Sequence, residues 1–184
     1  MQQILALLFV IASVVYFIFS IKVIQQTHKG VLERLGKFVR VVEPGVVFII
    51  PFIDRLKRRN ITERIADVEP QDIITKDNLN ARVDLQEYFK VKEDNESIKY
   101  SYYNVDDFKV QIIALAQTTA RNVIGDMKFI DVNNQRNELN TKIADIMKQE
   151  IKNWGVDIVR VELKEITPPE DVQATMNKVI KAQN

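Results

Sequence analysis

Residues 4–21 read ILALLFVIASVVYFIFSI, a run that contains no charge and no proline. A helix over this run would be roughly 27 Å long at about 1.5 Å per residue, which approaches the hydrocarbon thickness of a bilayer. Every face of that helix would be apolar, whereas a helix on a soluble core keeps a polar face. The run therefore predicts a transmembrane anchor over residues 1–24.

A cleaved signal peptide is the main alternative for this segment. Such a peptide has a basic N-terminal region and a small-residue cleavage site. Residues 1–3 carry no basic side chain, and no small-x-small site comes before Lys22. Basic residues follow the span at Lys22, Lys29, Arg34 and Lys37. The positive-inside rule then predicts a single-pass protein of the cell membrane whose body lies in the cytoplasm.

The composition excludes several classes of function. The chain has 184 residues with 26 Lys and Arg against 25 Asp and Glu, so its charge balance does not favour nucleic-acid binding. It has no cysteine and one histidine, which excludes disulfides, thiolate zinc sites and a cysteine nucleophile. No glycine-rich phosphate loop or serine-hydrolase motif occurs in the sequence. We therefore expect no enzymatic activity, cofactor or metal; an enzyme that uses only carboxylates is the catalytic class left open.

The first half of the body has the pattern of a β-rich region. Short β-branched runs predict strands over residues 23–27, 31–35, 38–42 and 61–68. The segment 46–53, VVFIIPFI, is continuously apolar around Pro51, and this proline indicates a strand end, a bend or an edge.

The second half mixes the two periods. Residues 79–91 and 156–166 alternate between apolar and polar side chains, which predicts two strands that each bury one face. Between them, apolar residues recur every three to four positions over 105–125 and 139–154, which predicts two helices that end at glycines. Thr167-Pro168-Pro169-Glu170 has the form of a helix start, and we expect the chain to stop inside a longer helix.

A basic run follows the apolar segment directly, and it has two interpretations. One is a solvated turn. The other is that the apolar segment enters the leaflet while the cations meet anionic headgroups, at about 1 kcal/mol per cation. The second assigns membrane insertion to Phe48, Ile49, Ile50, Phe52 and Ile53, and headgroup contact to Arg55, Lys57, Arg58 and Arg59.

Six ordered motifs resemble those of the SPFH group, which includes stomatin, prohibitin and flotillin. The motifs are Glu33-Arg34-Leu35-Gly36-Lys37, residues 44–54, Thr75-Lys76-Asp77-Asn78, residues 120–125, Trp154-Gly155-Val156, and residues 166–170 followed by Met176-Asn177. They look most like those of prokaryotic stomatin homologues, and the resemblance extends from the anchor to the last residue.

The resemblance implies an α+β fold with a transmembrane helix followed by an SPFH (band 7) domain. We expect an anchor over 1–24, a membrane-proximal β-rich subdomain over 25–75 and an α/β subdomain over 76–167. Residues 168–184 would then form the start of a long C-terminal helix. We expect the chain to be truncated before the coiled-coil part of that helix.

It also implies a membrane scaffold that self-assembles into rings or cages, organises a membrane microdomain and regulates membrane proteases or channels. Expected partners are membrane lipids, further copies of the chain, and an NfeD-like membrane protein or a protease. Candidate lateral contacts are Arg160, Glu162 and Lys164. The alternative is a monomeric peripheral lipid-binding module that uses the same apolar segment and basic run.

Overall fold

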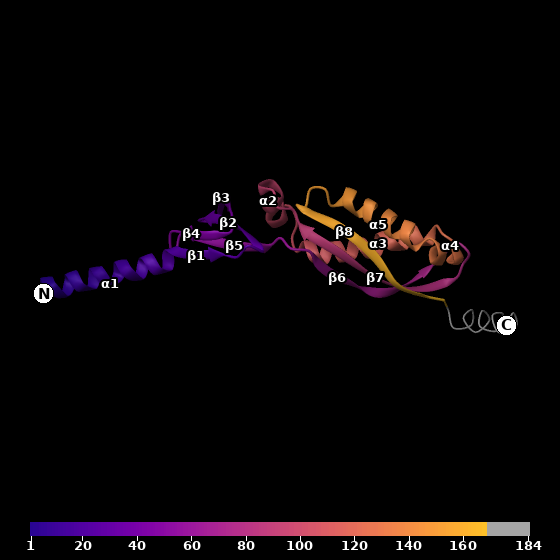
Figure 1. The fold of residues 1–184 in the computed structure, drawn as a ribbon, viewed down its shortest axis with the longest axis horizontal. Helices are drawn as coiled ribbons and strands as arrows, with labels where there is room; N and C mark the ends of the chain where they lie inside the picture. The colour runs from indigo at the N-terminus through magenta and orange to yellow at the C-terminus, as the bar shows by residue number, and fades with distance from the viewer. Residues whose placement is uncertain (169–184) are drawn as a thin grey trace.

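The computed structural model describes residues 1–168, so the helix expected from residue 168 onward lies outside the described residues. The apolar run forms one uninterrupted helix, α1 (Gln2–Ser20), in which Ser20 alone is buried. This helix extends away from the rest of the chain, at the opposite end from the larger sheet (Figure 1). It is long and apolar enough to cross a membrane.

Five short strands follow α1 and form two small antiparallel sheets. Strand β1 (Ile21–Ile24) continues directly from α1 and pairs with β4 (Gly45–Phe48). Strand β2 (His28–Arg34) lies between β3 (Lys37–Val42) and β5 (Asp54–Asn60). We call β1–β5 the proximal subdomain. Its small core consists of Ile24, Leu32, Val42 and Val47.

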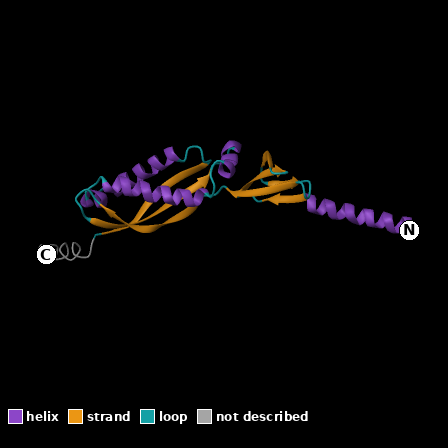
Figure 2. Ribbon diagram, turned by 180° about the vertical axis from the view of Figure 1, so that it is seen from behind, coloured by secondary structure: helices purple, strands orange, loops and turns teal. Residues whose placement is uncertain are grey.

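The larger sheet has the antiparallel order β6-β7-β8. Its strands are β6 (Arg64–Ile74), β7 (Asn80–Val91) and β8 (Val156–Thr167). Helices α3 (Phe108–Gly125) and α5 (Arg136–Glu150) lie on one side of it (Figure 2). We call this sheet with α3, α4 (Phe129–Asn134) and α5 the distal subdomain.

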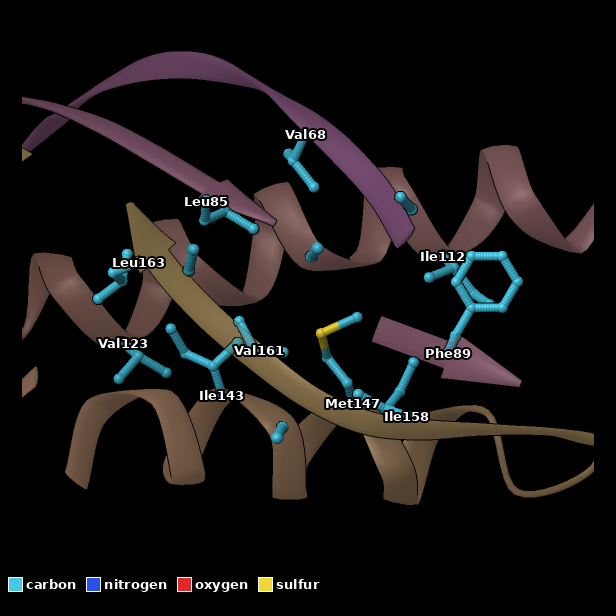
Figure 3. Packing of buried hydrophobic residues seen from close by; sticks show 14 of the residues in the cluster. Val68, Leu85, Phe89, Ile112, Val123, Ile143, Met147, Ile158, Val161 and Leu163 are labelled. Carbon is cyan, nitrogen blue, oxygen red and sulfur yellow. The ribbon is translucent and has the colours of Figure 1, made fainter. Parts of the chain in front are cut away.

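The main core fills the space between the sheet and these two helices (Figure 3). Leu85 and Phe89 of β7 belong to this core together with Ile112 of α3 and Met147 of α5, and Phe89 is drawn close to Ile112 (Figure 3). Alternate residues of β7 and β8 point into this core, as their period of two predicted.

Strand β5 was not predicted from the sequence, and three further elements differ from the sequence-based expectation. Helix α2 (Asn95–Tyr103) forms in a polar stretch, because the Asp94 side chain caps it by accepting from the Ser97 N–H at 2.8 Å. Helix α4 (Phe129–Asn134) is too short to show a period. Strand β6 continues to Ile74 and does not end at Val68 as predicted. Its second part was missed because a register shift after Val68 interrupts the alternation of buried and exposed residues. Because β6 pairs with β7 in the larger sheet, the proximal and distal subdomains separate between β5 and β6. This division comes earlier in the chain than the expected boundary at residue 75.

Candidate membrane face

The loop that joins β4 to β5 lies beside the C-terminal end of α1. Strand β1 pairs with β4 so that Ile21 is opposite Phe48. The Ile49 N–H then donates to the carbonyl of Ser20, the last residue of α1, at 2.8 Å. We call residues 49–53 the apolar loop. A helix that crosses a bilayer would therefore bring this loop to the membrane surface.

The apolar side chains of this end are exposed although the proximal subdomain has a core of its own. Phe52 is fully exposed and has a positive φ of 68°. Phe48, Ile50 and Ile53 are also exposed, whereas Ile49 packs partly against the small core. A contiguous exposed apolar patch of this kind is typical of membrane or protein contact.

Asp54 fixes the conformation of the apolar loop. Its carboxylate accepts two hydrogen bonds from the Arg34 guanidinium, at 2.7 and 3.1 Å, and one from the Ile50 N–H at 2.9 Å. The Arg34 hydrogen bonds, followed by the Ile50 N–H, lower the pKa of Asp54 below its ordinary value. The loop is thus held by a charged residue that stays ionised at neutral pH.

A second turn reaches the same end, and the sequence analysis did not assign it to the membrane contact. The turn between β2 and β3 has Leu35 and Gly36 at φ 49° and 80°. The Leu35 N–H donates to the Ile53 carbonyl at 3.1 Å, which joins this turn to the apolar loop. Leu35 is 79% exposed. The available signal was a leucine at a hairpin position that favours asparagine or aspartate.

The basic run forms β5, and its side chains differ in exposure. Arg55 and Arg58 are exposed. Lys57 instead donates to Glu33 at 2.7 Å, and Arg59 donates to the Ser101 carbonyl at 2.8 Å. Lys57 and Arg59 share one face of β5, and both reach residues of other elements. Their expected headgroup contacts stay a prediction.

Lys57 and Arg59 belong to a polar and aromatic junction between the two subdomains. The Arg59 guanidinium lies 3.9 Å from the Tyr102 ring centroid, and burial lowers the pKa of Arg59. Glu33 accepts from Lys57 and, at 2.6 Å, from the Tyr103 hydroxyl. Burial opposes ionisation of Glu33, but these hydrogen bonds outweigh it and lower its pKa. The junction therefore holds an ionised Glu33 paired with Lys57.

The three candidate lateral contacts lie together on the sheet face opposite the helices. Arg160 lies 3.5 Å from the Tyr88 ring centroid and pairs with both Glu63 and Glu162 at 2.9 Å. Lys164 pairs with Asp67 and lies 3.8 Å from Asp84. All these partners belong to the same chain. The sequence located this charged face, and its role as an interface stays a prediction.

Glu87 is a buried acid that the sequence analysis passed over. It lies on β7 between the core residues Leu85 and Phe89, opposite Ala66 and Val161 of the neighbouring strands. It is 0% exposed, and neither carboxylate oxygen has a hydrogen-bond partner among residues 1–168. Burial raises the pKa of Glu87 to about 8. The signal was a glutamate at an inward position of an otherwise apolar alternation.

Within the described residues, no three His, Cys, Asp or Glu side chains come together as metal ligands would. The geometry instead provides two kinds of surface. One is an apolar end beside α1, and the other is a charged, open sheet face. Both are suited to contact with a membrane or another macromolecule.

The chain resembles proteins of one family. The family model described as "SPFH domain / Band 7 family" matches residues 22–184. An uncharacterized protein of Methanothermobacter thermautotrophicus is 39% identical over 98% of this chain and 56% of its own length. An uncharacterized protein of Methanocaldococcus jannaschii is 38% identical over 89% of this chain and 80% of its own length.

A named relative is stomatin-like protein 2, mitochondrial, of Bos taurus. It is 30% identical over 87% of this chain and 44% of its own length. The chain thus spans little more than half of the Methanothermobacter relative and less than half of the bovine one. None of these names denotes an enzyme.

Proposed function

Because this chain belongs to the SPFH (Band 7) family, we propose that it is a membrane-anchored scaffold that assembles into large homo-oligomeric rings or cages. Such an assembly would organise a membrane microdomain and regulate membrane proteases or channels. The family and its stomatin-like relative support membrane association and self-association. The proposal assigns the protein no catalytic role.

The observation that carries the proposal is the convergence of α1, the apolar loop and Leu35 at one end of the proximal subdomain. A single helix would let the body swing freely about its membrane attachment. A second attachment beside it restricts the tilt of the body and fixes which sides face neighbouring copies. Lateral assembly requires such a fixed orientation, because a ring closes only when the rotation between subunits is constant.

The membrane contact consists of Phe48, Ile49, Ile50, Phe52 and Ile53, joined by Leu35. Arg55 and Arg58 are the basic residues of β5 left exposed, and they contact headgroups. Arg55 comes directly after Asp54 and is the closer of the two to the apolar loop along the chain. Arg58 makes its contact only if the body tilts toward the bilayer.

Topology and partners complete the proposal. The cluster of basic residues after α1 favours a single-pass protein of the cell membrane with a cytoplasmic body. An NfeD-like membrane protein or a membrane protease would act as its partner. Digestion of the body by protease added outside right-side-out vesicles would reverse the proposed orientation.

The membrane contact is tested by tryptophan fluorescence in the intact chain. Trp154 is the one tryptophan, so the Trp154→Phe variant gives a background without signal. In that background, we expect Phe52→Trp to be quenched by vesicles of brominated phosphatidylcholine. Ile130→Trp is the matched control, because Ile130 is an exposed apolar residue on α4 in the distal subdomain. Equal quenching of the two variants would remove the apolar loop from the membrane.

Assembly is tested by particle size in mild detergent, with negative-stain electron microscopy. We expect rings or cages of many copies, and smaller particles after Glu162→Arg. Glu138→Arg makes the same charge change on the exposed side of α5 and serves as the control. An unchanged particle size for Glu162→Arg removes that residue from the interface. Single copies of the unaltered protein would instead favour the lipid-binding module.

A further inference from the structure

A groove of about 540 Å³ runs between α1 and the apolar loop. Its walls are apolar on both sides. The helix contributes Ala12, Val15 and Phe19, and the loop contributes Ile49, Pro51 and Phe52. Tyr16 of α1 also lines the groove. The two charged residues of the lining are Lys22, on β1 just after α1, and Asp54, at the start of β5 just after the loop, so both lie at the end of the groove that adjoins the body.

The length of the groove along α1 corresponds to one leaflet. Ala12 is eight positions before Ser20, the last residue of α1, which is about 12 Å along the helix, and Lys22 follows two residues later on β1. From Ala12 to Lys22 the groove therefore covers roughly half of a hydrocarbon core about 30 Å thick. The groove therefore extends from the membrane surface to about the middle of the bilayer. An extended acyl chain of the adjoining leaflet covers the same depth, whereas the helix of a second copy would continue past Ala12.

The mouth of the groove carries a net positive charge. The Asp54 side chain is 1% exposed, and its charge is taken up by Arg34 and the Ile50 N–H. Lys22 forms no hydrogen bond or ion pair with any side chain among residues 1–168. An ammonium group at the headgroup level of a membrane attracts anionic lipid.

We propose that this groove holds one acyl chain of an anionic phospholipid, whose headgroup phosphate is contacted by Lys22. The inference rests on the proposed function in one respect: α1 and the apolar loop must share one leaflet. It adds a bound lipid with a defined place to that function. The lipid would fill the space between the two membrane attachments and hold them at a fixed distance.

The test uses the intact protein in vesicles of phosphatidylcholine that contain a phosphatidylglycerol with a photoreactive acyl chain. After irradiation, mass spectrometry locates the label. We expect labelling of the groove lining, and at least a fivefold loss of label from the apolar loop in Ala12→Trp, which fills the groove. Ser13→Trp places the same side chain on another side of α1 and should leave this labelling unchanged. Lys22→Gln should lower labelling about fivefold toward that of a photoreactive phosphatidylcholine.

Several results would overturn the inference. Labelling spread evenly around α1, or an equal effect of Ala12→Trp and Ser13→Trp, would show that lipid contacts the helix without occupying the groove. Equal labelling by the two lipids in the unaltered protein would remove the role of Lys22. The Phe52→Trp quenching experiment separates these outcomes from failure of the proposed function, because it reports loop insertion whether or not a lipid fills the groove. Cross-links between copies through the groove would assign it to a second α1.

Discussion

Replacing Glu87 with methionine is expected to stabilise the protein and to remove a pH dependence of its folding. The side chain is fully buried between β7 and the helices, and burial raises its pKa to about 8 from an ordinary value of 4.5. No hydrogen-bond partner among the described residues offsets this burial. Methionine has a similar length and no charge, so it fills the same space without an ionisable group.

The sign of the effect follows from proton binding. Between about pH 4.5 and 8, folded Glu87 keeps a proton that the unfolded chain releases. Stability contributed by this group is complete below the unfolded pKa and is lost as the pH rises toward the folded pKa. The loss is about 1.4 kcal/mol per pH unit, so it reaches roughly 3 kcal/mol at pH 7.

The measurement is urea unfolding in detergent micelles from pH 5 to 8, followed by the fluorescence of Trp154. The free energy of unfolding of the unaltered protein minus that of Glu87→Met isolates the Glu87 contribution. We expect this difference to become more negative as the pH rises. Glu138→Met removes an exposed acid on α5 and is the matched control. A difference that does not change with pH would refute the reasoning, as would a variant less stable than the unaltered protein at pH 7.

Three further variants test single contacts by their urea midpoints. Gly155→Ala should lower the free energy of unfolding by more than about 1 kcal/mol, because φ is +71° there and the new Cβ would lie 1.9 Å from the Ser97 carbonyl oxygen. An unchanged urea midpoint would contradict this close approach. Asp77→Ala should cost about 1–2 kcal/mol, since Asp77 accepts from the Phe129 N–H at the start of α4; a loss below about 0.5 kcal/mol would make that contact unimportant. Leu35→Asn should stabilise the body by about 1 kcal/mol while weakening its vesicle binding in flotation; a loss of both would contradict the turn geometry.

The sequence predicted the elements whose residues repeat regularly over a buried face. The strands β7 and β8 and the helices α3 and α5 follow from their periods of two and about 3.6. Helix α2 could not be predicted in this way, because its start depends on one capping contact and its docking on Gly155. Strand β5 was hidden because neither of its faces is apolar. Its basic side chains meet acids and aromatic rings of other elements, which the sequence alone does not bring together.

The candidate membrane face was predictable in part for a similar reason. An uninterrupted apolar segment next to cations is visible in the sequence, so the apolar loop was singled out, and its membrane insertion stays a prediction. The different exposure of the basic side chains was not visible, since it depends on β5 pairing with β2 so that Lys57 reaches Glu33. Leu35 was missed because its place depends on a single backbone hydrogen bond to Ile53.

Backbone strain at this face argues that the membrane is part of the folded state. Among the described residues, four that are not glycine have positive φ: Leu35, Phe52, Asn78 and Asp107. Asparagine and aspartate tolerate this region, whereas leucine and phenylalanine each lose about 1–2 kcal/mol in it. The two strained residues lie in the apolar loop and in the turn hydrogen-bonded to it, and both are exposed.

Among residues 1–168, no contact with a core offsets this strain, because neither side chain belongs to or packs against a core cluster there. Burial of a leucine or phenylalanine side chain away from water contributes about 1.5–3 kcal/mol, which exceeds the cost of the backbone at each position. In the proposed attachment, the bilayer is the apolar medium next to α1. Two side chains that destabilise the body in water would then stabilise its attachment to the membrane, and this exchange would explain why the turns do not carry the residues that their geometry favours.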